Sequence, residues 1–187
     1  MKERPILFTT PMVQAILDGR KTMTRRIIKL RTLTQGNTIN YLGQLSFEKY
    51  ILAYFSSIDW ETEIKCPYGV PGDQLWVKET FENELRQINY KACNNEVNNN
   101  PAYASLTKWT PSIFMPKVAS RITLKIIDIQ VERLHDISDT DILKEGVVKG
   151  TSASLFGAWG GTWGGINGYQ SWISNPWVWV IEFERLT

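Results

Sequence analysis

Apolar positions near the start of the chain predict a short helix and then a strand. Pro11 precedes three apolar residues at helical spacing, Met12, Ile16 and Leu17. Gly19 follows them, and glycine just past the last turn is the usual left-handed end of a helix. The next residues favour a strand because four are β-branched: Thr22, Thr24, Ile27 and Ile28. Lys21 and Thr24 are therefore expected at a helix-to-strand corner.

Alternating apolar and polar residues predict further strands. Residues 66–73 have turn composition and lead into a strand over 74–79. Residues 121–134 alternate over a long strand, with one face formed by Ile122, Leu124 and Ile126. A last strand follows Asn175-Pro176, and its core face is formed by Trp177, Trp179, Ile181 and Phe183. The apolar spacing over 47–55 suits either a short helix or a strand.

A short helix is predicted between the last two strands. Ser138 is followed three residues later by Asp141, which is a helix-start signature, and the helix covers 139–145 and ends at Gly146. Three aspartates in this region suggest a metal site as the alternative: Asp136, Asp139 and Asp141. We interpret them as helix-start residues and expect no metal.

Two segments lack a periodic pattern. Residues 82–112 are polar and asparagine-rich, which predicts a surface excursion. Residues 150–172 hold seven glycines and three tryptophans, Trp159, Trp163 and Trp172, a composition that predicts a long loop. These tryptophans either plug one end of the fold or offer surfaces on which a base stacks, for about 1–3 kcal/mol.

Together the elements predict one α+β domain over residues 1–187, mostly β, built as a small antiparallel β-barrel with short flanking helices. The length suits one domain, and 43% hydrophobic with 21% charged residues is typical of a soluble globular protein. No apolar run reaches the roughly 20 residues that span a bilayer, and no signal-peptide core follows Met1–Arg4. We expect a cytoplasmic protein with no membrane partner.

Few residues of this chain can take part in redox or histidine-dependent chemistry. Cys66 and Cys93 lack C-x-x-C spacing and are expected to be free thiols. His135 is the single histidine, which argues against a His-rich zinc site. It lies at the end of an alternating segment, where a structural role is the interpretation and a catalytic one the alternative. No cofactor motif is present, and none is expected.

Positive charge is concentrated near the N-terminus. The first 33 residues carry eight cations against Glu3 and Asp18, whereas the whole chain has a net charge of +2. Such a cluster either binds phosphate or another anion, as in nucleic acids, or forms a solvated basic face. Four of the cations lie within one short stretch: Arg20, Lys21, Arg25 and Arg26.

Four segments, in order along the chain, resemble the ASCH domain family of the PUA-like superfamily. They are Gly19–Arg26, Pro71–Val77, Ser138–Gly146 and Trp177–Phe183. The resemblance is closest to the larger ASCH proteins of bacteriophages and prophages. It implies a PUA-like barrel in which three segments are insertions: 31–65, 82–112 and 150–172.

The resemblance also implies an activity and a set of site residues. A compact bacterial member of the family is an amidohydrolase that removes the acetyl group from the exocyclic nitrogen of acetylcytidine with a lysine, a threonine and a glutamate. Its G-R-K-T-x-T motif is similar to residues 19–24, which implies roles for Lys21 and Thr24. The glutamate corresponds to Glu145. Expected ligand contacts come from Arg20, Arg25, Arg26, Trp159 and Trp163.

This chemistry also follows from the residue types. A threonine hydroxyl becomes nucleophilic when a base takes its proton, and a lysine can be that base if burial or nearby cations lower its pKa. Glu145 would orient Lys21 or help to protonate the leaving amine. Regular strand alternation would place Lys21 and Thr24 on opposite faces, so the site requires the turn after Gly19 to bring them together.

Three other functions remain as alternatives. A noncatalytic module that binds RNA or a modified base would need the arginines and the tryptophans but not the hydroxyl of Thr24. A ribonuclease would use the cationic cluster for phosphate charge, with Lys21 as acid or base. The last alternative is a phage protein that binds a host protein. Apart from that last alternative, these functions share one expected partner, a modified nucleoside or RNA.

Overall fold

The computed structural model describes residues 1–28, 51–55, 61–84, 87–93, 108–150 and 154–187. Its main element is a five-stranded sheet with the strand order β1-β5-β8-β9-β2. The strands are β1 (Glu3–Leu7), β5 (Gln74–Lys78), β8 (Thr123–Arg133), β9 (Trp177–Arg185) and β2 (Met23–Ile27). β1 and β5 are parallel, and the other three pairs are antiparallel.

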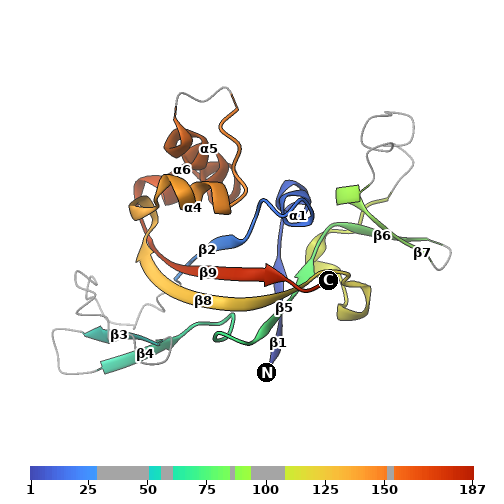
Figure 1. Ribbon diagram of the computed structural model, residues 1–187, viewed down its shortest axis with the longest axis horizontal. Helices are drawn as coiled ribbons and strands as arrows, with labels where there is room; N and C mark the ends of the chain where they lie inside the picture. The colour runs from blue at the N-terminus through green and yellow to red at the C-terminus, as the bar shows by residue number, and fades with distance from the viewer. Residues whose placement is uncertain (29–50, 56–60, 85–86, 94–107, 151–153) are drawn as a thin grey trace.

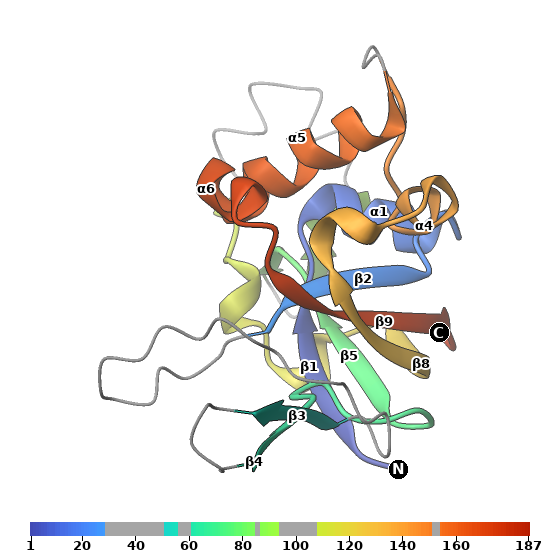
Figure 2. The same ribbon diagram turned by 90° about the vertical axis from the view of Figure 1, so that its left-hand side faces the viewer.

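Helices and small hairpins complete the fold (Figure 1). The α-helices are α1 (Thr10–Leu17), α4 (Asp139–Lys144), α5 (Leu155–Asn167) and α6 (Tyr169–Ile173). Two hairpins lie outside the main sheet, β3 (Ile51–Phe55) with β4 (Glu61–Lys65) and β6 (Phe81–Glu84) with β7 (Gln87–Tyr90). Short 3-10 helices are η1 (Lys91–Cys93), η2 (Ser112–Phe114), η3 (Lys117–Ala119) and η4 (Leu134–Asp136). Both views place α4, α5 and α6 together beside β2 and β9 (Figures 1 and 2).

The α+β class is confirmed, but the predicted barrel is wrong. β1 and β2 form opposite edges of the sheet, and no pairing joins them among the described residues. Local sequence patterns predict strands correctly at β2, β5, β8 and β9, yet they carry no information on which strands pair or whether the sheet closes. The result is an open, mixed sheet.

The predicted loop at 150–172 is also wrong, because α5 and α6 occupy most of it. Ser154 begins α5 by accepting a hydrogen bond from the backbone N–H of Gly157 at 3.0 Å. Trp159 and Trp163 lie one helical turn apart, and both are buried. Packing of these two large side chains outweighs the low helix propensity of the glycines around them.

Strand β9 has buried side chains on both faces. Trp179, Ile181 and Phe183 belong to the main core cluster, with Trp177 packed at its edge, so the predicted core face is confirmed. Val178 and Val180 point to the other face, in a second cluster that contains both tryptophans of α5. The predicted inner face is confirmed for Leu124 and Ile126 of β8 and for Ile122 just before it, and a bulge follows between Ile126 and Asp128.

The remaining predicted elements are largely confirmed. α1 ends before Gly19, whose φ is 73°, and Ser138 caps α4 by accepting from the N–H of Asp141 at 3.1 Å. Residues 51–55 form a strand, whereas 47–50 lie outside the described residues. The polar excursion at 82–112 begins within hairpin β6–β7, and 94–107 lie outside the described residues.

Two glycines allow a matched test of the packing between α1 and the end of α4. Gly146 has φ 80°, and an added Cβ would lie 2.8 Å from the Ala15 Cβ and 3.0 Å from the Lys21 Cβ. Gly19 has a similar φ of 73°, but no atom of the described part of the chain lies within 4 Å of the position of its added Cβ. Gly19→Ala should destabilise by about 1–2 kcal/mol through backbone strain alone. Gly146→Ala should cost roughly 1–3 kcal/mol more through overpacking. Urea unfolding measures both, and equal losses would contradict this packing.

Candidate active site

The corner after α1, at Arg20 and Lys21, pairs with the C-terminal end of α4. The carbonyl of Ala15 accepts from the backbone N–H groups of Arg20 at 2.8 Å and Lys21 at 2.9 Å. Lys21 pairs in an isolated antiparallel bridge with Glu145, the residue that ends α4. The two sequence segments that carry Lys21 and Glu145 are therefore neighbours in space, although 124 residues separate them.

The amine of Lys21 is buried and fully hydrogen-bonded. Its side chain is 0% exposed. Nζ donates to Glu145 Oε2 at 2.6 Å, to the Met23 carbonyl at 2.7 Å and to the Glu145 carbonyl at 2.9 Å. Three acceptors match the three protons of an ammonium group. A neutral amine would leave one acceptor without its donor and would present a lone pair.

Burial lowers the pKa of Lys21 below the ordinary lysine value. The carboxylate of Glu145 opposes this shift through its charge and its hydrogen bond, while Arg26 and Arg25 lower the pKa further. Because the net direction is downward, loss of the proton is easier here than for a lysine in water.

Arg25 connects three carboxylates beneath the pocket. Nη1 of its buried guanidinium lies 3.3 Å from Glu145 Oε1. Nη2 lies 2.6 Å from Glu132 Oε1 and 3.5 Å from Asp141 Oδ2. Glu145 thus gives one oxygen to Lys21 and the other to Arg25. Burial raises the pKa of Glu132, and Arg25 partly offsets that effect. The arrangement fixes the orientation of the Glu145 carboxylate.

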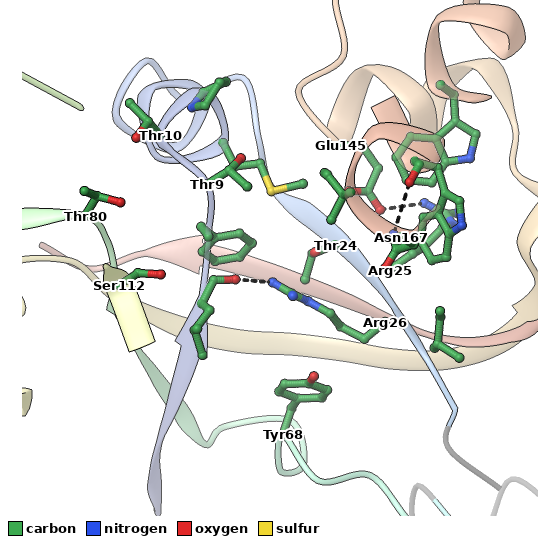
Figure 3. A pocket seen from close by; sticks show the side chains of 18 residues that line it. Thr9, Thr10, Thr24, Arg25, Arg26, Tyr68, Thr80, Ser112, Glu145 and Asn167 are labelled. Atoms are coloured by element: carbon green, nitrogen blue, oxygen red, sulfur yellow. Dashed lines mark hydrogen bonds and ion pairs between the residues drawn. The ribbon is translucent and has the colours of Figure 1, made fainter. Parts of the chain in front are cut away.

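A cavity of about 720 Å³ lies beside this network (Figure 3). Its walls come from the β1–α1 connection, β2, the end of α4 and α5. Thr24, Arg25, Arg26 and Glu145 line it together, and Lys21 lies behind them and is not part of the wall. In Figure 3, Thr24 lies between Glu145 and Arg26.

Of the three predicted catalytic residues, Lys21 and Glu145 are hydrogen-bonded to each other, whereas the side chain of Thr24 has no hydrogen-bond partner among the described residues. It is 1% exposed, and its hydroxyl makes no hydrogen bond to any residue of the described chain. Lys21 Nζ bonds the carbonyl of Met23, the residue directly before Thr24. The structure therefore brings Lys21 and Glu145 into contact, whereas Thr24 shares the pocket wall with Glu145 and forms no bond to either residue.

The predicted ligand-binding arginines lie in different surroundings. Arg20 is outside the pocket, where it bonds Asp18 Oδ2 at 2.8 Å and the Gly146 carbonyl at 3.2 Å. Arg26 lines the pocket, donates to the Leu7 carbonyl at 2.6 Å and lies 5.1 Å from the centre of the Phe8 ring. Burial lowers the pKa of Arg26.

Carboxylates balance most of the positive charge in the motif. Arg20, Lys21 and Arg25 each form an ion pair with an aspartate or a glutamate. Within the described part of the chain, Arg26 is the motif cation that makes no ion pair within 4.0 Å. The predicted cationic cluster is therefore largely neutralised internally, and residues 29–31 of that cluster lie outside the described residues.

Trp159 and Trp163 are core residues that also face the pocket, so the structure supports their packing role and leaves base stacking as a prediction. Both are buried in the second core cluster, with ring centroids 5.5 Å apart, and both also line the pocket. Trp163 Nε1 donates to Ser171 Oγ at 3.1 Å, whereas Trp159 Nε1 has no partner among the described residues.

His135 and the cysteines lie apart from the pocket. The His135 ring packs 4.3 Å from Trp172 and 5.7 Å from Phe156. Cys66 and Cys93 are free thiols. The described residues hold no group of three acidic, cysteine or histidine side chains that would bind a metal, and no helix among them is long and apolar enough to cross a membrane.

Sequence reasoning missed Glu132 and the second role of Asp141. Glu132 occupies a polar position of an alternating strand, which predicts an outward side chain and nothing about its partner. Asp141 was interpreted only as a helix-start residue, yet it also pairs with Arg25.

No family model, curated protein or solved structure matches the chain.

The buried pair of Lys21 and Glu145 should dominate the stability of the corner. Lys21→Met would leave the Glu145 carboxylate buried without its nearest cation, and removing one partner of a buried pair costs about 3–5 kcal/mol. Lys144→Met is the matched control, because Lys144 pairs with Glu182 at the surface, where such pairs contribute about 0–1 kcal/mol. Urea unfolding at pH 7 compares them. Equal losses would show that the buried pair is not structurally important.

Proposed function

We propose that this protein is an amidohydrolase that removes an acyl group from the exocyclic amine of a modified cytosine nucleoside or nucleotide. The observation that carries the proposal is the hydroxyl of Thr24, which lines the pocket without a hydrogen-bond partner among the described residues. The residue before it, Met23, accepts a hydrogen bond from Lys21, a buried lysine whose pKa is lowered by its surroundings. A hydroxyl and a potential base near a cavity are the parts that acyl transfer requires.

In the proposed reaction, neutral Lys21 takes the proton of Thr24 as its oxygen attacks the acyl carbonyl carbon. The C–N bond then breaks, and the proton moves from Lys21 to the departing amine of the base. Water hydrolyses the acyl-threonine and restores the hydroxyl. Lys21 Nζ must turn from the Met23 carbonyl, to which it donates at 2.7 Å, toward Thr24 in this step.

The neighbouring residues have supporting roles in this proposal. Glu145 holds Lys21 through Oε2 while Arg25 holds the other carboxylate oxygen. Arg26 is the pocket cation without a carboxylate within 4.0 Å among the described residues, so it is suited to stabilise negative charge on the carbonyl oxygen. The aromatic wall and the volume of about 720 Å³ suit a nucleobase with its sugar.

We also propose that the chain is an ASCH protein whose PUA-like sheet is open in place of a closed barrel. Support comes from the bridge between Lys21 and Glu145, because it joins two of the four segments that carry the resemblance. In this interpretation α5 and α6 form an insertion that covers the site.

A noncatalytic pocket for a modified base or RNA is the second candidate. It is favoured by the three acceptors around Lys21 Nζ, which match an ammonium group that has no need to lose its proton. Phosphate binding is disfavoured at Arg25, since three carboxylates already surround it. This makes a ribonuclease the weaker alternative.

Substitution of Thr24 separates catalysis from binding. Thr24→Val keeps the shape and removes the hydroxyl, so it should reduce deacylation of acetylcytidine and other acylated cytosines by at least about 100-fold. Thr24→Ser keeps the hydroxyl and should retain measurable turnover. Calorimetric binding of the substrate to Thr24→Val should be nearly unchanged. If wild type and Thr24→Val bind equally and neither turns over, the noncatalytic pocket is correct.

The pH dependence should report Lys21. Turnover requires the neutral amine, so kcat should rise with pH, with a midpoint below the ordinary lysine value of about 10.4 because burial lowers the pKa. Glu145→Gln removes the charge that raises this pKa, so the rising limb should move to lower pH. A shift to higher pH in Glu145→Gln would exclude Lys21 as the titrating base.

A further inference from the structure

The reacting groups are closed off from solvent. Thr24 is 1% exposed, and Glu145 and Arg25 are also buried. Contact between Thr24 and a substrate would require removal of part of this covering. Some element of the pocket wall must therefore move before a substrate can react.

Helix α5 forms one wall of the pocket through side chains along its length. Trp159, Trp163, Ile166 and Asn167 all line the cavity. Figure 2 shows α5 on the same side of the molecule as α1, α4 and β2. Residues of α1, of β2 and at the end of α4 supply other walls of the pocket. Movement of α5 would thus open one wall of the pocket and expose the cluster that its tryptophans share with β2 and β9.

The composition of α5 makes it an unstable helix. Five of its 13 residues are glycine: Gly157, Gly160, Gly161, Gly164 and Gly165. An added Cβ at Gly161, Gly164 or Gly165 would meet no atom of the described residues within 4 Å, so packing among them does not require glycine at these three positions. Each glycine weakens a helix about fivefold relative to alanine. At these three positions the helix has glycine, which favours the unfolded state, although alanine would fit.

We propose that α5 is a lid over the pocket that opens by local unfolding of its glycine-rich turns. The identification of the covered pocket as a reaction site rests on the function proposed above. The buried tryptophans hold the lid closed, and Gly168, with φ 85°, joins α5 to α6 and offers a hinge. Opening exposes Thr24 to the substrate, and closing returns both tryptophans to the core.

Alanine substitutions in α5 test the lid without relying on catalysis. Hydrogen exchange of the α5 amides should slow about fivefold in each of Gly161→Ala, Gly164→Ala and Gly165→Ala, and about 100-fold in the triple variant. In a Thr24→Cys background, modification of the new thiol by a maleimide, followed by mass spectrometry of the peptide, should slow by the same factors. The peptide readout separates this thiol from Cys66 and Cys93.

Two substitutions serve as controls. Thr140→Ala raises the helix propensity of an exposed position in α4 and should leave both rates unchanged. Gly160→Ala changes the same helix but places a Cβ 3.0 Å from the Trp172 ring, so exchange and labelling should accelerate.

Two results would overturn the lid. If α5 exchange slows while labelling at residue 24 does not, another element uncovers the site. If neither rate slows, α5 does not open by unfolding. Failure of deacylation would leave both measurements intact, because neither depends on turnover, so failure of the lid and failure of the proposed function are distinguishable.

Discussion

The site depends on the burial of one amine. Lys21 lies at the corner where α1 ends, and its Nζ reaches acceptors on β2 and at the end of α4. A buried charge without partners would be prohibitively costly, so this amine requires the carboxylate of Glu145. That requirement brings two distant chain segments together and sets the position of Thr24 on the neighbouring strand.

The same requirement explains the charge pattern. A stretch rich in cations predicts a surface for anions, but the structure turns Lys21 and Arg25 inward and surrounds them with carboxylates from β8 and α4. Charge that is balanced inside the fold contributes little to phosphate binding. What remains for a ligand is a pocket with several hydroxyls, aromatic walls and Arg26, the lining arginine that has no carboxylate within 4.0 Å among the described residues.

Sequence patterns predict what is local. The end of α1 at Gly19, the cap at Ser138 and the alternation of β8 each follow from neighbouring residues. The open sheet does not, because strand pairing joins residues far apart in the chain. Helix α5 was missed because its glycines disfavour a helix and only burial of Trp159 and Trp163 offsets them. The partners of Arg25 were missed for the same reason, since Glu132 lies 107 residues away.

We propose that Lys21 acts as a buried base, because its proton is easier to remove than that of an ordinary lysine. Its pKa can be measured directly by a pH titration of the side-chain ¹³Cε and ¹⁵Nζ NMR signals, assigned by comparison with Lys21→Arg. We predict a pKa below the ordinary value of about 10.4, because burial outweighs the pull of Glu145. A pKa at or above that value would mean that the ion pair holds the proton, and it would contradict a catalytic role for Lys21.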